Sequence, residues 1–241
     1  MKALKIHFEP RNNDDELYGQ SKWWGPADFP DSLEYPLIKF EDGDTNPMTM
    51  ICQIRCADLA PVDHENLLPH TGMLYFFADI DEYVGALNQD EEEDVSEEDE
   101  DDGYFINDDG FPEKDVICDY CGNSMGEWDN DSFRVVYSPT EDDLVERNIM
   151  NDDDTPYTLP AEKLTFEVDD NPAELDFHLL GKPFETEVQQ EYPGYINLLQ
   201  VWEEERWGLT MFDCGIINFL IKPEDLKARR FDRVVLYLHS C

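Results

Sequence analysis

Short apolar segments recur along the chain, separated by stretches rich in Gly, Pro, Asn and Asp. They are six to eight residues long and rich in Val, Ile, Phe and Tyr, a composition typical of buried β-strands. The pattern predicts strands at residues 48–55, 73–78, 133–138, 163–168, 195–202, 216–221 and 233–238.

Helical segments are fewer: a turn at 57–59 and the segments 184–190 and 223–229. In the last segment, Pro223 suits the first helical position and Arg229 suits the negative end of the helix dipole. The helices do not alternate regularly with the strands, so parallel βαβ units are not expected. The sequence therefore predicts an α+β fold of mostly antiparallel sheets with few short helices.

Two parts of the chain show the same features in the same order. Each has a turn containing Gly and Pro, then an apolar strand with a central Gln, and then an aromatic strand that follows a Gly. This order predicts the internal duplication of one β unit. The copies are marked by Gly25, Gln53 and Gly72, and by Gly181, Gln200 and Gly215.

Gln53 and Gln200 stand at the same point of the two copies, within apolar strands. A buried amide needs hydrogen-bond partners, so each Gln either holds neighbouring backbone or faces a ligand. In the second interpretation both line a cleft between the repeats, because pockets often form at internal interfaces. The residues expected at such a ligand-binding cleft are Lys22, Trp24, Gln53, His178, Gln200 and Asp213.

The chain has 58 acidic and 17 basic residues, and its formal net charge is −41. Eleven acidic residues stand between Asp90 and Asp102, and without them the net charge is still −30. We expect residues 88–131 to form an acidic loop insertion, because uncompensated charges cannot be packed. Nucleic acids and anionic membranes are recognised through Lys and Arg, so neither is expected as a partner.

Such a surface has more than one interpretation. It can serve as a solvated face that keeps the protein dispersed, or as a docking surface for a basic protein, since complementary charge steers association. Adaptation to a salty host cytoplasm is a third explanation, which would make unrelated proteins of the host equally acidic.

Residues 1–10 mix Lys, His and Glu with short apolar runs, so they do not resemble a secretory signal. No apolar stretch approaches the roughly 18–20 residues that span a bilayer. We expect a cytoplasmic protein in which residues 1–241 form a single domain.

The six cysteines are expected to be free thiols in that compartment. Cys118 and Cys121 form a CxxC, but a structural zinc site needs a second ligand pair, and Cys52 and Cys56 lie in a strand-like segment. The sequence also lacks the Gly-x-Ser-x-Gly, Walker, GxGxxG and His-Glu-x-x-His motifs. We therefore expect no metal, no cofactor and no catalytic residue.

The segment Ser21-Lys22-Trp23-Trp24-Gly25-Pro26 resembles the opening signature of the YwqG-like family of uncharacterised bacterial proteins. The strands around Gln53 and after Gly72 are similar to that family, as are residues 133–138 and much of 178–226. Trp24 stands where the family usually has Gly, and the acidic insertion is outside its usual pattern. The family has no established activity, so the resemblance implies no particular chemistry.

The acidity and the missing catalytic motifs favour a non-enzymatic cytosolic binding protein that presents an acidic surface to a basic protein partner. Such a protein would act as an immunity protein or a nucleic-acid mimic does. The alternative is a small-ligand binder or an enzyme that uses the cleft between the two repeats.

Overall fold

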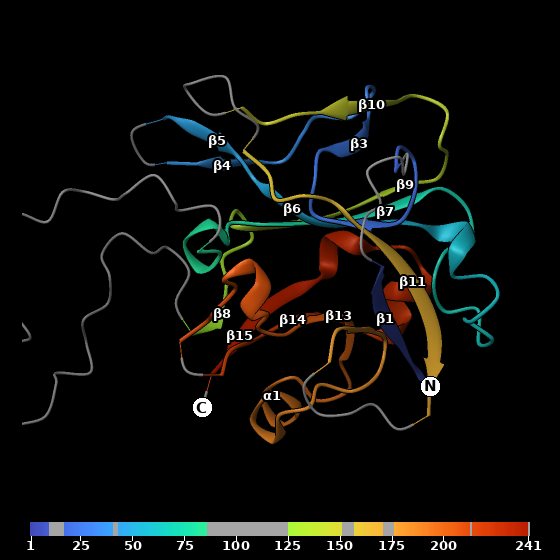
Figure 1. The fold of residues 1–241 in the computed structure, drawn as a ribbon. Helices are drawn as coiled ribbons and strands as arrows, with labels where there is room; N and C mark the ends of the chain where they lie inside the picture. Colours follow the sequence, from blue (N-terminus) through green and yellow to red (C-terminus); the bar gives the residue numbers. More distant parts are fainter. Residues whose placement is uncertain are drawn as a thin grey trace, which may run out of the picture.

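The computed structural model describes residues 1–9, 17–40, 43–85, 125–150, 157–170, 176–212 and 214–240. Within these residues the main feature is an antiparallel 11-stranded sheet that curls around a hydrophobic core (Figure 1). In order of pairing its strands are β8 (Gly126–Glu127), β15 (Val235–His239), β14 (Ile216–Ile221), β13 (Ile196–Val201), β12 (His178–Leu179), β1 (Ala3–Glu9), β11 (Glu162–Asp169), β2 (Lys22–Trp23), β6 (Thr49–Arg55), β7 (Met73–Ala78) and β9 (Phe133–Ser138).

Two smaller sheets and several short helices complete the described structure. The small sheets pair β3 (Ala27–Pro30) with β10 (Leu144–Arg147), and β4 (Leu37–Lys39) with β5 (Thr45–Pro47). The helices are α1 (Thr186–Glu191), α2 (Pro223–Lys227) and the 3₁₀ turns η1 (Cys56–Asp58), η2 (Asp81–Tyr83), η3 (Glu205–Trp207) and η4 (Phe231–Arg233).

The predicted α+β class is wrong, because the described residues are predominantly β-structure. An α+β fold needs a layer of helices packed on the sheet. Here α1 has six residues and α2 has five, which is too short to make a layer. The predicted segments 184–190 and 223–229 do overlap the short helices α1 and α2, but the apolar pattern is not long enough to extend them.

All seven predicted strands are present, with ends that differ by at most two residues. The sequence pattern missed β1, in which Lys5 and His7 alternate with apolar residues and remain partly exposed. Of the predicted insertion at 88–131, residues 88–124 lie outside the described residues. Its last part is not a loop, because β8 pairs with β15 and Trp128 is buried.

The strand order is symmetric about the central pair of β1 and β11. On one side of this pair lie β2, β6, β7 and β9, which we call the first half, and on the other side lie β12, β13, β14 and β15, the second half. The short strand β8 pairs with the outer edge of β15 and has no counterpart beside β9. In both halves the strands appear in chain order from the centre outward. Each central strand pairs with the half that is farther away in the chain order. The N-terminal strand β1 pairs with β12 of the second half, and β11 pairs with β2 of the first half.

The pairing registers of the two halves also correspond. Lys22 lies opposite Gln53 in the first half, and His178 lies opposite Gln200 in the second. Each Gln strand has a register shift that begins three residues before its Gln. Equivalent left-handed turns follow β2 and β12, at Trp24-Gly25 and Leu180-Gly181.

The main core lies between the two halves, where Phe76 of β7 and Phe219 of β14 meet with ring centroids 5.3 Å apart. Each half also has an outer face. In Figure 1 the pairs β3–β10 and β4–β5 lie above β6 and β7, whereas α1 lies below β13, β14 and β15. Polar residues on these outer faces are therefore buried under different covers.

Candidate functional site

A buried ion pair lies on the outer face of the first half. The Lys22 Nζ atom is 2.8 Å from Asp28 Oδ2, and neither side chain is more than 3% exposed. Gln53 Nε2 donates to the same oxygen at 2.7 Å, and Gln53 Oε1 accepts from the Asp28 backbone N–H at 2.8 Å. The Gly19 N–H donates to Asp28 Oδ2, and the Tyr75 hydroxyl donates to the Asp28 carbonyl. We call Lys22, Asp28, Gln53 and Tyr75 the charged cluster.

The charged cluster fastens two covering segments to the sheet. Asp28 belongs to β3, and Gln53 Nε2 also donates to the Gln20 carbonyl at 2.9 Å, just before β2. A buried pair of this kind is tolerated because hydrogen bonds and opposite charge offset its desolvation. This arrangement matches the interpretation in which Gln53 holds neighbouring backbone in place.

The second half has neutral side chains at the corresponding positions. Gln200 Nε2 donates to the Asp176 carbonyl at 3.0 Å, and Gln200 Oε1 accepts from Asn197 Nδ2 at 3.0 Å. His178 Nδ1 lies 3.3 Å from the same carbonyl. Asn218 faces Gln200 from β14. We call His178, Asn197, Gln200 and Asn218 the amide cluster; its members are at most 3% exposed.

Five of the six residues expected at one cleft are described, and they are distributed over three places. Lys22 and Gln53 belong to the charged cluster, and His178 and Gln200 belong to the amide cluster. Trp24 packs in the main core, with its ring 5.6 Å from that of Trp207. Asp213 lies outside the described residues. The structure thus brings residues together within each half, and ligand binding at the six residues stays a prediction.

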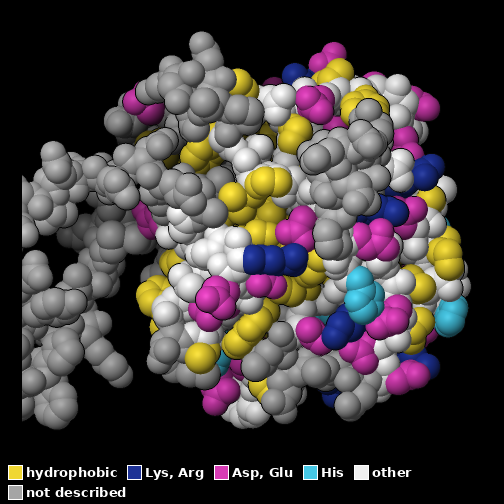
Figure 2. All heavy atoms as spheres, in the orientation of Figure 1, with side chains coloured by type: hydrophobic (Ala, Val, Ile, Leu, Met, Phe, Trp, Pro, Cys, Tyr) yellow, Lys and Arg dark blue, Asp and Glu magenta, His cyan; other side chains and the backbone are white. Residues whose placement is uncertain are grey.

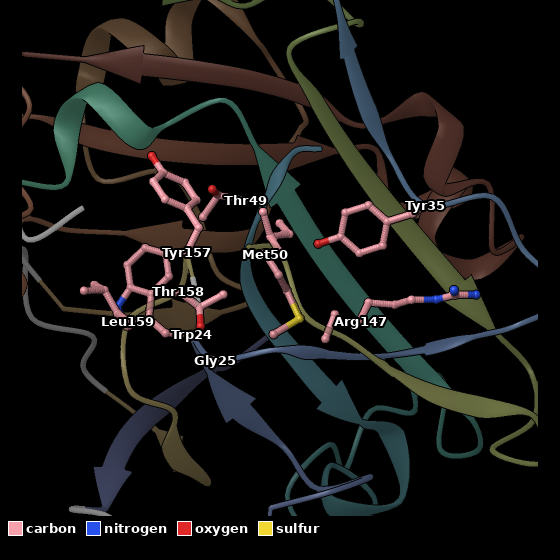
Figure 3. Close-up of a pocket in the computed structure, with 11 residues that line it drawn as sticks. Trp24, Gly25, Tyr35, Thr49, Met50, Arg147, Tyr157, Thr158 and Leu159 are labelled. Carbon is pink, nitrogen blue, oxygen red and sulfur yellow. The ribbon is translucent and has the colours of Figure 1, made fainter. Parts of the chain in front are cut away.

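A pocket lies where the covering segments of the first half meet the sheet. The pocket is narrow and has room for about one water molecule, and Trp24, Tyr35, Met50, Arg147 and Tyr157 contribute to its wall. Figure 3 shows the Tyr35 hydroxyl pointing toward Met50, while the Arg147 guanidinium extends away from the pocket centre. Arg147 Nη2 instead pairs with Asp31 at 2.8 Å. The pocket is therefore largely aromatic.

Asp81 is the titratable group beside this pocket. The hydroxyls of Thr49 and Tyr157 donate to its carboxylate. Burial is the largest influence and raises the pKa of Asp81 to about 6, against the opposing effect of these hydrogen bonds. Burial and the Asp81 charge also raise the pKa values of Tyr35 and Tyr157. Asp81 can therefore exchange a proton near neutral pH.

Sequence reasoning missed this group. Asp81 follows the apolar strand β7, which indicates a strand end rather than a buried acid. Its partner Tyr157 lies far along the chain, beside Pro156. Only the fold brings the two segments together, so the sequence pattern contained no signal for their hydrogen bond.

Two of the described thiols, Cys52 and Cys56, have the properties of structural cysteines, whereas Cys214 is exposed. Cys52 is fully buried, and burial raises the pKa of Cys52 and brings that of Cys56 to about 12. A thiol that stays protonated is a poor nucleophile and metal ligand. Cys118 and Cys121 lie outside the described residues. Within the described ranges, no group of three or more His, Cys, Asp or Glu side chains is placed to hold a metal ion.

Comparison with known proteins gives a family without an assigned activity. The model of a domain of unknown function, DUF1963, matches residues 21–241. A search of curated proteins found no match. Among the helices of the described residues, none is long and apolar enough to cross a membrane.

Proposed function

Because the chain belongs to the DUF1963 family, whose function is unknown, we propose a function from its physical chemistry. We propose that it is a non-enzymatic, cytoplasmic binding protein of YwqG-like type that presents its acidic surface to a basic protein. The observation that supports this proposal most strongly is the net charge of −41. A charge of this size produces a long-range field that accelerates encounters with cationic partners.

The arrangement of the few basic residues supports the same proposal. Ten of the 17 Lys and Arg side chains already lie in ion pairs with carboxylates of the chain; they are Lys2, Lys5, Lys22, Lys163, Arg55, Arg134, Arg147, Arg206, Arg230 and Arg233.

Figure 2 illustrates this distribution on one face, where magenta carboxylates are scattered and most dark blue groups adjoin them. Cations that are already paired contribute little attraction for anionic partners, whereas many carboxylates remain available. Immunity proteins and nucleic-acid mimics act through this kind of surface, and we propose the same mode here.

The test uses a small basic protein of high isoelectric point as a probe, with a neutral protein of similar size as a control. We expect binding to the basic probe that weakens steeply as KCl rises, mainly through slower association. Changing Asp152, Asp153 and Asp154 to Asn, together with neutralising residues 90–102, should reduce the association rate. Salt-independent binding, or binding that is equal in the neutralised variant, would contradict the proposal.

A second candidate function is small-ligand binding at the aromatic pocket, which requires its covering segments to move apart because the pocket has room for about one water molecule. It is favoured by Asp81, whose pKa of about 6 lies in the range that suits proton exchange with a ligand. Ligand-observed NMR with polar aromatic fragments at pH 5 and pH 7 tests it. Binding that depends on pH and is lost in Tyr157→Phe would support this function. If no fragment binds to the wild-type chain, this candidate function is ruled out.

A further inference from the structure

Five buried polar atoms beside the amide cluster have no hydrogen-bond partner of normal geometry. Four are side-chain oxygens and one is an imidazole nitrogen. Buried polar atoms are nearly always satisfied, by protein, water or an ion. The atoms are Asn197 Oδ1, Asn218 Oδ1, both Glu185 carboxylate oxygens and His178 Nε2.

The orientation of these groups follows from the backbone carbonyls that they contact. The Asp176 carbonyl can only accept, so it must face the Gln200 NH₂ group and a protonated His178 Nδ1. Gln200 Oε1 then faces the Asn197 NH₂ group, which leaves Asn197 Oδ1 as the unpaired atom. In the same way, Asn218 Nδ2 faces the Ile216 carbonyl at 3.4 Å.

The two amide oxygens are therefore acceptors, and the Glu185 carboxylate is an acceptor when it is ionised. His178 belongs with them, because burial lowers its pKa and keeps the ring neutral, with a lone pair on Nε2. The Asn218 amide and the Glu185 backbone N–H contribute some hydrogen bonding to the Glu185 carboxylate. The acceptors that remain are satisfied by a cation or by donors from outside the chain. A rotation of one amide cannot satisfy them without breaking an existing hydrogen bond.

Glu185 supplies the negative charge of this group. It is 7% exposed and precedes α1, but its side chain caps none of the α1 N–H groups. Burial raises its pKa, and the nearby Asn218 amide and His239 ring partly oppose that effect. The three amides and both carboxylate oxygens of Glu185 are buried.

The first half shows how this fold neutralises a buried carboxylate. There the Lys22 ammonium group lies on Asp28. At the equivalent position the second half has His178, which is neutral. No Lys or Arg of the described residues makes an ion pair with Glu185.

We propose that Glu185, Asn197 and Asn218 bind a small, oxygen-preferring metal cation of the Ca²⁺ type on the outer face of the second half. Ca²⁺ accepts carboxylate and amide oxygens together with water, in flexible geometry. His178 Nε2 would accept a hydrogen bond from a coordinated water. The cation would do in the second half what the Lys22 ammonium group does in the first.

The experiment titrates the full chain with CaCl₂ by calorimetry, in about 150 mM KCl to screen the acidic surface. We expect one site above the nonspecific background in the wild type, and at least tenfold weaker binding in Glu185→Gln. The matched control is Glu187→Gln, which removes an exposed carboxylate two residues away and should keep the site. Equal Ca²⁺ binding in the two variants would overturn the proposal, because the ion would then only screen charge.

A second variant keeps the proposal testable if Glu185→Gln folds poorly. Asn218→Asp adds a carboxylate to the site, so it should tighten Ca²⁺ binding. With EDTA present, the same variant should melt below the wild type, because two carboxylates then share the site without a cation. If Asn218→Asp does not bind Ca²⁺ more tightly than the wild type, the site is not a cation site. Mg²⁺ should bind more weakly than Ca²⁺, since it demands octahedral geometry.

Discussion

The two halves of the sheet place different chemistry on equivalent backbone positions. In the first half, Lys22 and Asp28 form a buried ion pair that Gln53 and Tyr75 support. In the second half, His178 and Asn218 take the places of Lys22 and Tyr75, and among the described residues no Lys or Arg pairs with Glu185 beside the cluster.

The difference shows that the backbone pairing is set independently of the buried polar groups. Strand order, register and the bulge before each Gln are the same in both halves, although the side chains differ. The ladder hydrogen bonds and the apolar core between the halves are common to both. The outer faces were therefore free to diverge, and each predicted effect below follows from this divergence.

The largest effect is expected for Lys22→Met. It leaves the Asp28 carboxylate buried without its cation, which costs about 3–5 kcal/mol in the free energy of unfolding. The equivalent change, His178→Met, removes a neutral ring and should cost much less. Urea unfolding of both variants measures the difference. Adding Asp28→Asn to Lys22→Met should restore part of the lost unfolding free energy, because the buried negative charge is then removed. Equal losses of unfolding free energy in Lys22→Met and His178→Met would contradict the comparison.

A pH effect of about 2–3 kcal/mol is expected from Asp81. Its pKa is about 6 in the folded chain, against an ordinary value of 3.8. The folded state therefore binds this proton more tightly, and the resulting stability is present below about pH 4 and lost as the pH rises through 6. Asp81→Asn should remove this part of the fall in unfolding free energy between pH 4 and 7.

The second half offers a matched control for this pH effect. Glu224 occupies the place equivalent to Asp81 in the short helix after the aromatic strand, but it is exposed. Glu224→Gln should show the wild-type pH dependence. If the unfolding free energy of Asp81→Asn varies with pH in the same way as that of Glu224→Gln, Asp81 is not the source of the pH dependence.

A difference of about 1 kcal/mol is expected between Gln53→Leu and Gln200→Leu. Gln53 bonds the Asp28 N–H, the Asp28 carboxylate and the Gln20 carbonyl, whereas Gln200 bonds only Asp176 and Asn197. Gln53→Leu should therefore be the more destabilising variant in chemical denaturation. The reverse order would show that the amide cluster contributes more than its hydrogen bonds indicate.

The smallest effect is expected for deletion of residues 90–102. In the second half, residues 222–234 connect β14 to β15, whereas the first half inserts the acidic run between β7 and β9. The run cannot gain stability by packing its charges, so its loss should leave the melting temperature unchanged or slightly higher. Raising KCl to a few hundred millimolar should stabilise the full chain more than the deletion variant. A large fall in melting temperature on deletion would contradict this prediction.

Sequence reasoning was most successful where burial was continuous. The predicted strands at 73–78 and 216–221 coincide with β7 and β14, in which every residue is buried. These strands pack on both faces or against aromatic neighbours, so their residues form apolar runs that are visible without a structure. The partly exposed strand β1 and the two-residue strands β2 and β12 carry no such run, and they were missed.

The candidate site was less predictable. Lys22, Gln53, His178 and Gln200 were recognised as polar residues at special positions, and each of them is buried in a cluster. Asp28, Asp81 and Glu185 gave no signal, since acidic residues are abundant in this chain. The fold alone distinguishes them, because it buries Asp28 and Glu185 and partly buries Asp81.

The sequence by itself determined the strand segments, the repeated order of features around Gln53 and Gln200, and the net negative charge of the chain. These depend on the identity and local order of residues. The tertiary structure decided that the sheet curls around one core, which turns Gln53 and Gln200 outward to separate faces. It also decided which carboxylates lose water and which of them meet a cation, because both depend on distances between segments that are remote in the chain.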